Sequence, residues 1–299
     1  MEMEESVPDL SELHQGLKQQ GYIADEQTLH VLQYSLLLNK PILIEGPAGA
    51  GKTELAKAWS RTLGRTLIRL QCYEGIDEAK ALYEWNYQKQ LLYIQAQSAD
   101  TKLWQAAGRN IYTEEFLLAR PLLQAIRRPK PAVLLIDEID KSDEEFESFL
   151  MEILSDWQVS IPETGTVSAV TIPSVLLTSN STRDMSHALR RRCLYLYLDY
   201  PDAERELDIV RLYFPTLNET LGRQIVALVR KLRLEKLKKH PSISEVLDWT
   251  AALTRMEART LTADLAMETL NVLIKYHEDW HKITAKIQDK DWFGGISHF

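Results

Sequence analysis

The sequence of 299 residues predicts an α/β protein in which a parallel sheet of about five strands lies between helices, followed by an all-helical domain. Three observations support this fold class. Short apolar runs alternate with segments of helical periodicity, a glycine-rich loop joins one such run to a helix, and only helical periodicity remains after Pro201. We therefore expect an α/β core over residues 1–201 and a helical domain over residues 202–299.

The N-terminal part of the predicted core contains helices that lead into a buried strand. Residues 9–38 are expected to form two helices broken near Gly21. Residues 42–44 are a short continuous apolar run, which is typical of a strand buried on both faces of a parallel sheet. After Lys52, large apolar residues recur every four positions until Gly64, so a helix that ends at this glycine is predicted.

Further apolar runs supply the remaining strands of the predicted sheet. They lie at residues 66–70, 132–136, 174–178 and 193–198. Two segments interrupt the alternation of strands and helices. Residues 83–95 alternate apolar and polar side chains where a plain helix is due. Residues 158–171 have strand-like arms around Glu163, Thr164 and Gly165, which predicts a hairpin.

Beyond Pro201, the apolar positions recur at helical spacing. The expected helices cover residues 221–232, 246–256 and 270–276. Each carries apolar side chains on one face, so these helices can bury a core of their own. This pattern is the reason for placing a domain boundary near residue 201.

Composition and charge narrow the possible functions. Lys and Arg number 35 against 43 Asp and Glu, so the net charge of -8 gives the whole chain no general attraction to nucleic acids or anionic membranes. The two cysteines, Cys72 and Cys193, are too few for a disulfide framework and lack the spacing of zinc ligands. The acidic N-terminus does not resemble a signal peptide, and no apolar run approaches the length of a membrane span. We expect a soluble, cytoplasmic protein.

A phosphate-binding loop is the strongest local motif. It consists of Gly46, Pro47, Ala48, Gly49, Ala50, Gly51, Lys52 and Thr53, which match G-x-x-x-x-G-K-[ST] between a predicted strand and a predicted helix. Backbone N–H groups of such a loop surround the phosphates of ATP, Lys52 reaches the β- and γ-phosphates, and Thr53 offers a hydroxyl to Mg²⁺. Glu54 follows directly and is included among the expected nucleotide contacts. A chance glycine-rich turn is the alternative, but it would rarely carry Lys52 and Thr53 together.

An acidic pair follows the apolar run at residues 132–136. Asp137 and Glu138 are expected at the carboxyl end of this strand, where ligands of open α/β sheets bind. Asp137 would hold Mg²⁺, and Glu138 would act as the base that polarises the attacking water. An acidic helix cap is the alternative, because residues 142–145 read as a capping box, but that cap lies beyond the pair.

The acidic pair also separates classes of reaction. A small-molecule kinase needs no water-activating glutamate beside its metal ligand, whereas a hydrolase does. The Asn-Lys-x-Asp motif by which GTPases read guanine is absent from the sequence. ATP hydrolysis to ADP and phosphate is therefore the expected reaction.

Together these motifs resemble those of the AAA+ ATPases, and within them the MoxR family of the clade that has an insert in its second helix. Residues 46–53 look like the Walker A motif, residues 134–138 like Walker B, and residues 177–180 like the strand that ends in the sensor 1 residue. Segments 83–95 and 158–171 fall where this clade has its helix-2 insert and the hairpin before sensor 1. The resemblance covers most of the chain and implies a P-loop AAA+ core with a C-terminal helical lid.

The resemblance assigns further residues to the site. Asn180 is similar to the sensor 1 residue, whose neutral amide can bond the γ-phosphate and the attacking water; a strand-end asparagine in a turn is the alternative. Residues 188–193 are similar to the helix end that carries the arginine finger, with Arg192 in the family's position and Arg191 beside it. Arg190 and Arg191 can equally be cations that favour a helix C-terminus. Tyr22 and Ile23 resemble the segment that lines the adenine.

One position departs from the family pattern. AAA+ lids usually place a sensor 2 arginine at the start of their third helix, where this chain has Glu245. Ser242 and Glu245 form a capping box, which favours a plain helix start. Arg255 and Arg259 are weaker substitutes for the missing arginine, so coupling between the lid and the phosphates is in question.

The resemblance implies a functional class. A MoxR-type protein is expected to form a ring, commonly a hexamer, whose ATP hydrolysis drives chaperone-like remodelling, maturation or assembly of a client protein or metalloenzyme. Its partners often include a protein with a von Willebrand factor A domain. One alternative is a translocase stimulated by nucleic acid, because residues 230–239 hold six basic side chains, although nucleic acid is not the expected partner. Another is a nucleotide-gated scaffold with little turnover.

Overall fold

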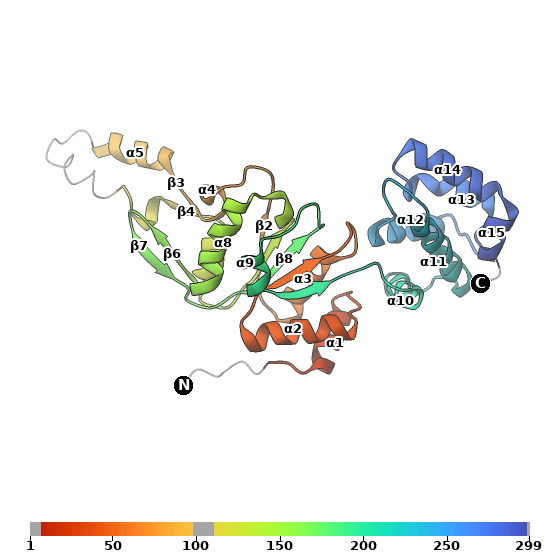
Figure 1. Cartoon of the computed structure of the whole chain (residues 1–299), viewed down its shortest axis with the longest axis horizontal. Helices are drawn as coiled ribbons and strands as arrows, with labels where there is room; N and C mark the ends of the chain where they lie inside the picture. Colours follow the sequence, from red (N-terminus) through yellow and green to blue (C-terminus); the bar gives the residue numbers. More distant parts are fainter. Residues whose placement is uncertain (1–6, 98–110, 298–299) are drawn as a thin grey trace. The chain divides into compact units, whose positions relative to one another are not determined.

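The computed structural model describes residues 7–97 and 111–297 and divides into two compact units. The first unit holds the residues up to 13 together with residues 25–45 and 53–197. The second unit holds residues 14–24, 46–52 and the chain from residue 198 onward. The helices and strands of each unit are labelled in Figure 1.

The first unit is built around a five-stranded sheet of order β2-β5-β8-β1-β9. Every neighbouring pair in this sheet is parallel, as the alternation of strands and helices predicted. The three central strands are almost fully buried, because each presents a continuous apolar run to helices on both faces. The strands are β1 (Ile42–Glu45), β2 (Leu67–Gln71), β5 (Val133–Asp137), β8 (Ser174–Ser179) and β9 (Leu194–Tyr197).

The helices of the first unit begin and end where the sequence supplies caps. Asp25 accepts a hydrogen bond from the backbone of Thr28 at the start of α2, and Asn39 ends that helix in the left-handed conformation. At α8 the cap is Asp143, which accepts from Phe146, so the capping box predicted at residues 142–145 is wrong: the helix is capped one residue later, and Phe146 cannot close a box. Helix α1 (Leu10–Gln19) is divided between the units, with residues 14–19 in the second. The other helices of the first unit are α2 (Glu26–Leu38), α3 (Lys52–Thr62), α4 (Glu78–Ala81), α5 (Tyr87–Gln97), α7 (Pro121–Ile126), α8 (Glu144–Asp156) and α9 (His187–Arg192).

Two small antiparallel ribbons extend the first unit. The ribbon of β6 (Gln158–Ile161) and β7 (Gly165–Ser168) is the predicted hairpin. The other ribbon pairs β3 (Tyr83–Trp85) with β4 (Leu117–Ala119). Of residues 83–95, where apolar and polar side chains alternate, only the first three form a strand, and α5 follows. Figure 1 shows α5 and the hairpin at the same end of the first unit.

The second unit is helical beyond residue 202. Its core contains fully buried Trp249, whose indole N–H donates to the hydroxyl of Thr269. The helix predicted over residues 270–276 is wrong, because this stretch is a short 3₁₀ turn and a junction between two helices. The apolar residues of this junction are buried, and their spacing along the sequence resembles that of a helix. The helices are α10 (Ala203–Tyr213), α11 (Glu219–Leu234), α12 (Ile243–Arg255), α13 (Ala263–Thr269), α14 (His277–Gln288) and α15 (Lys290–Ser297).

Two sequence-based exclusions can be compared with the structure. Cys72 and Cys193 are free, and burial raises the pKa of each thiol to about 12, so neither is a reactive thiolate at neutral pH. Within residues 7–97 and 111–297, no helix has both the length and the apolar character needed to cross a membrane.

A buried ion pair joins α10 to α11 in the second unit. Arg233 donates two hydrogen bonds to Glu206, at 3.0 Å and 2.7 Å, and these side chains are only 9% and 1% exposed. Arg233 also donates to the backbone oxygen of Pro241 and lies over the ring of Tyr200. Because removing one partner of a buried pair leaves an uncompensated charge, this contact is a sensitive point of the helical unit.

We predict that Arg233→Met lowers the free energy of unfolding by about 3–5 kcal/mol, measured by urea titration. Arg233→Met combined with Glu206→Leu should recover most of that loss, since no charge is then buried. The matched control is Arg223→Met, which removes an exposed pair with Glu219 and should cost less than about 1 kcal/mol. Equal losses of stability in Arg233→Met and Arg223→Met would contradict the role given to the buried pair.

Candidate functional site

The phosphate-loop sequence forms a tight turn between β1 and α3. Lys52 is buried, and its ammonium group donates to the backbone oxygens of Gly46 at 2.6 Å and Pro47 at 2.9 Å. A Cβ at Gly46 would lie 1.9 Å from the backbone oxygen of Leu198, and one at Gly49 would lie 2.2 Å from Cβ of Ser242. Both positions therefore require glycine, which lets the backbone approach its neighbours closely.

The segment expected to line an adenine lies against this loop within the second unit. Tyr22 is buried, and its ring would lie 3.7 Å from a Cβ placed on Gly51. The backbone oxygen of Ile23 accepts a hydrogen bond from Arg205 at 3.0 Å. An aromatic side chain is thus held beside the loop, as expected for a nucleotide contact, and adenine binding stays a prediction.

The start of α12 also touches the loop. Ser242 and Glu245 form the predicted capping box, and Lys239 donates to Glu245 at 2.7 Å. Burial raises the pKa of Glu245, but the hydrogen bonds from Lys239 and Ser242 outweigh burial, so its pKa is lowered and the carboxylate is charged. The backbone N–H of Ile243 donates to Gly49 at 3.3 Å.

The substitutes for sensor 2 are not at this end of the helix. Arg255 is the last residue of α12, about 18 Å along the axis from its first turn, and Arg259 lies beyond the helix. At the start of α12 the contact with the loop is thus made by the backbone N–H of Ile243.

Asp137 ends β5 in the first unit and is the centre of a polar cluster. Its carboxylate accepts hydrogen bonds from the hydroxyl of Thr53 at 3.2 Å and 3.3 Å, and from that of Thr178 at 2.5 Å. The guanidinium of Arg69, on neighbouring β2, donates to the same carboxylate at 3.0 Å and 2.5 Å. Burying this carboxylate is tolerated because these donors replace water.

The two predicted metal ligands thus lie side by side. A carboxylate and a hydroxyl are the hard oxygen ligands that Mg²⁺ uses in nucleotide sites, where water and phosphate oxygens complete its shell. No group of three or more potential metal-ligating side chains occurs in the described residues, and such a shared Mg²⁺ site does not need one. Thr53 and Asp137 fit this cation.

Glu138 follows Asp137 in a backbone conformation that is uncommon for a residue other than glycine. Its φ is 57°, and its backbone N–H donates to the hydroxyl of Thr178 at 2.9 Å. Its carboxylate accepts from Gln71 at 2.9 Å and from Lys141 at 2.5 Å, and the side chain is 32% exposed. The backbone turns this carboxylate out of the sheet to a position that solvent can reach.

Asn180 begins the loop after β8, and this loop is held by Asp140. One carboxylate oxygen of Asp140 accepts the backbone N–H groups of Asn180 and Thr182 and the hydroxyl of Thr182, at 3.2 Å, 3.1 Å and 2.7 Å. Burial raises the pKa of Asp140, but these hydrogen bonds outweigh burial and hold the pKa below its usual value. A charged Asp140 therefore fixes the backbone at Asn180.

The three arginines at the end of α9 have different surroundings. Arg190 is paired with Glu45, and Arg192 donates to the hydroxyl of Ser155 on α8. The side chain of Arg191 is exposed and makes no hydrogen bond or ion pair with the part of the chain that the structure describes. Glu54, expected near the nucleotide, pairs with Lys57 one turn along α3.

Sequence reasoning missed the residues that hold the acidic pair in place. Arg69 and Gln71 lie two positions apart on β2, and Gln71 is in register with Asp137. Two polar side chains on the same face of one strand indicate that a polar group lies opposite that face, but the sequence does not show which strand carries that group. Thr178 and Asp140 lack such a signal, because their role depends on which strands are neighbours.

The basic segment at residues 230–239 is largely paired within the second unit. Lys231 donates to the backbone oxygen of Trp292, Arg233 is in its buried pair, and Lys238 and Lys239 pair with Glu278 and Glu245. These cations have intramolecular partners, so they do not form a free surface for nucleic-acid phosphates.

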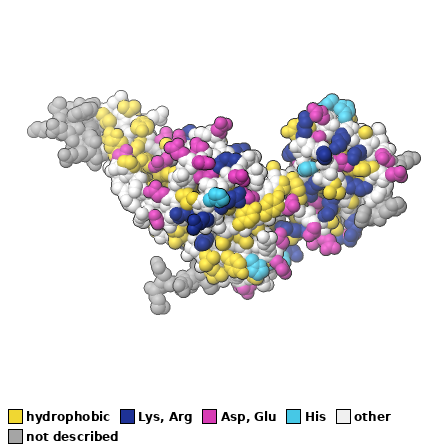
Figure 2. Space-filling model, in the orientation of Figure 1, with side chains coloured by type: hydrophobic (Ala, Val, Ile, Leu, Met, Phe, Trp, Pro, Cys, Tyr) yellow, Lys and Arg dark blue, Asp and Glu magenta, His cyan; other side chains and the backbone are white. Residues whose placement is uncertain are grey.

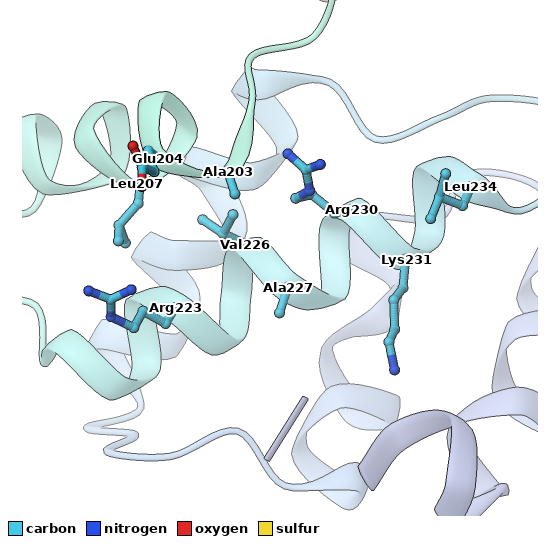
Figure 3. Close-up of a pocket in the computed structure, with 9 residues that line it drawn as sticks. All are labelled: Ala203, Glu204, Leu207, Arg223, Val226, Ala227, Arg230, Lys231 and Leu234. Atoms are coloured by element: carbon cyan, nitrogen blue, oxygen red, sulfur yellow. The ribbon is translucent and has the colours of Figure 1, made fainter. Parts of the chain in front are cut away.

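A groove of about 430 Å³ lies between α10 and α11 (Figure 3). Its floor is apolar, and Figure 3 shows Ala203 and Leu207 of α10 facing Val226 of α11. Arg223, Arg230, Lys231 and Glu204 are also among its lining residues. Residues 46–53 and the acidic pair are not part of this lining.

Comparison with known proteins identifies the family. The model of the family described as AAA domain (dynein-related subfamily) matches residues 41–193, just over half of the 299 residues. The chain therefore belongs to this AAA family. The match spans the phosphate loop, the acidic pair, Asn180 and the three arginines of α9.

Two relatives in sequence agree with this result. The chain is 22% identical over 285 residues to the gas vesicle ATPase GvpN of Haloferax mediterranei, which covers 91% of this chain and 80% of that protein. It is 23% identical over 256 residues to the protein NorQ of Paracoccus denitrificans, which covers 83% and 84%. A solved structure of a RuvB mutant from Thermotoga maritima has 17% identity and a TM-score of 0.49 over 86% of this chain and 72% of that chain. The family resemblance predicted from the sequence is confirmed. The protein is an AAA+ ATPase of the MoxR-like type and binds nucleotide.

The lowered pKa of Asp140 predicts how stability depends on pH. A lowered pKa means that Asp140 stabilises the fold fully above its usual pKa of 3.8, and that this contribution is lost as the pH falls through the lower folded-state value. Unfolding titrations from about pH 6 to about pH 3 should therefore show the advantage of the wild type over Asp140→Asn shrinking only below about pH 4. The control Asp248→Asn, at an exposed position in the middle of α12, should show no comparable change. An advantage that grows on acidification would contradict the role given to Asp140.

Proposed function

We propose that this AAA+ ATPase uses Mg²⁺-dependent hydrolysis of ATP in a ring to remodel, mature or assemble a client protein. The observation that carries the proposal is the polar cluster in the first unit, where Thr53 of α3 contacts Asp137 at the end of β5 and Glu138 follows directly. The membership of the AAA family and the similarity to GvpN and NorQ support the same class of activity. Residues 1–201 would act as the nucleotide-binding core and residues 202–299 as the lid.

Each residue of the site has a proposed role that its chemistry supports. The backbone of residues 46–51 would surround the phosphates, and Lys52 would exchange the carbonyl oxygens of Gly46 and Pro47 for the β- and γ-phosphate oxygens. Thr53 and Asp137 would hold Mg²⁺, which when bound would neutralise charge on the phosphates. Arg69 would release the carboxylate of Asp137 for that purpose.

The remaining roles concern the attacking water. Glu138 would accept a proton from the water, and Asn180 would orient the water and the γ-phosphate through its amide. Arg191 and Arg192 would stabilise, from one subunit, the charge that develops in the site of the next. Tyr22 and Ile23 would border the adenine.

A ring is supported by the family and by the solvent-facing arginine. Proteins of the AAA+ family typically form oligomeric rings, and we propose a hexamer. Arg191 is exposed at the surface of α9, which is where a residue that serves a neighbouring site has to lie.

A protein with a von Willebrand factor A domain is a candidate partner. The cytoplasm is the proposed location, in keeping with two free cysteines.

The insert supplies a candidate contact surface for the client. Tyr87, Leu91 and Leu92 of α5 are 62%, 59% and 67% exposed, and Figure 2 shows hydrophobic side chains along this helix. Apolar residues exposed together on one helix are typical of a surface that binds another protein. Hydrolysis would move this surface against the client.

A translocase driven by nucleic acid is the weaker alternative. It needs a basic surface that is free to bind phosphates, and four of the six basic side chains at residues 230–239 already have partners within the chain. ATPase activity that rises on addition of DNA or RNA and falls steeply with salt would favour this alternative over the proposal. A nucleotide-gated scaffold instead predicts negligible turnover by the wild type.

The Glu138→Gln variant tests both hydrolysis and the client. It should bind ATP as the wild type does but lose about 10²- to 10⁴-fold in turnover, because Gln cannot accept the proton. Held in ATP, it should retain the client on affinity capture, and Leu91→Asp in the same variant should release it. The control is Glu144→Gln, an exposed acid of α8. Unchanged turnover in Glu138→Gln would remove Glu138 from its role.

Mixing inactive subunits tests whether sites are shared. Lys52→Ala subunits lack phosphate binding and Arg191→Ala/Arg192→Ala subunits lack the fingers, so each is expected to be inactive alone. Mixed in equal amounts, they should recover a measurable share of ATPase activity, because one kind supplies fingers to the loop of the other. No recovery at any mixing ratio would argue against action between subunits.

A further inference from the structure

The helix that carries the three arginines is too short to fix its own orientation. Helix α9 has six residues, whereas isolated helices shorter than about 12 residues are marginal in water. Ser186 caps its start, and Leu189 is its buried apolar residue. Its last turn holds three adjacent cations, which repel one another. Contacts with the rest of the first unit must therefore hold α9 in place.

Arg190 makes the main polar contact between α9 and the sheet. Its guanidinium donates to both carboxylate oxygens of Glu45, at 2.8 Å and 3.4 Å. This fork-shaped geometry is specific to arginine and fixes direction as well as distance. The Glu45 side chain is 7% exposed and Arg190 is 34% exposed, so salt screens this pair less than it screens a fully exposed pair.

Tyr195 completes the set around Glu45. Its hydroxyl, on edge strand β9, donates to Glu45 at 3.0 Å. Burial and the hydrogen bond to Glu45 raise the pKa of Tyr195, so the hydroxyl keeps its proton and remains a donor. Glu45 thus ties α9 to two neighbouring strands, β1 and β9. It is also the last residue of β1, directly before Gly46 of the phosphate loop.

We infer that Arg190 is a positioning residue, whose pairing with Glu45 and Tyr195 holds α9 so that Arg191 and Arg192 face a neighbouring subunit. Arg190 itself is not a finger, because its guanidinium is already used within its own chain. This inference rests on the proposed function, since it concerns fingers that act between subunits. Arg192 contacts Ser155 in the same chain and Arg191 is exposed, so both can exchange solvent or a weak contact for a phosphate.

The test asks which subunit of a mixed ring needs Arg190. The reference mixture combines Lys52→Ala subunits, which only donate fingers, with Arg191→Ala/Arg192→Ala subunits, which only accept them. Adding Arg190→Ala to the donor should lower the recovered activity about 100-fold, because a misplaced catalytic group costs roughly that factor. Adding it to the acceptor should change the activity less than about 2-fold, because α9 of that subunit supplies no finger. Equal losses on both sides would overturn the inference.

Glu45→Gln separates positioning from direct action. Placed in the donor, where the phosphate loop is already disabled by Lys52→Ala, it cannot act through its own loop. If Arg190 positions α9, Glu45→Gln should reproduce most of the loss seen with Arg190→Ala, and Arg190→Lys should restore part of the activity through a single ion pair. If Arg190 were itself a finger, releasing it from Glu45 would leave the activity intact, and that result would overturn the inference.

Hydrogen exchange tests the anchor without any ring. The amides of Arg190 and Cys193 are bonded to Ser186 and Leu189 within α9. In Arg190→Ala and in Glu45→Gln they should exchange about 10-fold faster, while amides of the central strands are unchanged. The control Arg191→Ala should leave α9 as it is. Failure of the reference mixture would refute shared sites alone, whereas unchanged exchange in Arg190→Ala would refute the anchor.

Discussion

Charged groups buried at the ends of parallel strands impose the constraint on which the first unit depends. A carboxylate removed from water needs hydrogen bonds or a cation in return. Glu45 receives them from α9 and β9, Asp137 from β2, α3 and β8, and Asp140 from the loop after β8. The acids thus tie α9, α3 and the loop after β8 to the strands of this sheet. The need of a buried carboxylate for donors or a cation therefore explains how these acids organise the first unit.

The strands could be predicted because each is a short apolar run with a turn signal beside it. The phosphate loop and the acidic pair followed, since their motifs are local. Residues 270–276 could not be assigned correctly, because a buried junction between helices has the same apolar spacing as a helix. The alternating pattern of β2 conceals that Arg69 and Gln71 face the acids of β5, and only the strand order reveals it. The sequence of three consecutive arginines also does not show which of them pairs with Glu45.

In the second unit, Glu245 has a structural role at the position where AAA+ lids usually carry an arginine. Its carboxylate closes a capping box, and the helix that it starts places a backbone N–H on Gly49 of the phosphate loop. A cap fixes the beginning of a helix to within a residue. The contact between the loop and α12 within this unit is therefore made by the main chain, and no long cationic side chain takes part in it.

The strand order has a consequence for the making of the protein. Strand β1, which leads into the phosphate loop, pairs on one side with residues 176–179 and on the other with residues 194–197. Both partners are synthesised long after β1 itself. During translation the loop therefore waits without its supporting strands until more than half of the chain has left the ribosome, and contacts so distant in sequence form slowly. A nascent chain that ends before β9 has the complete nucleotide motif but lacks one of the two strands that hold β1 in place.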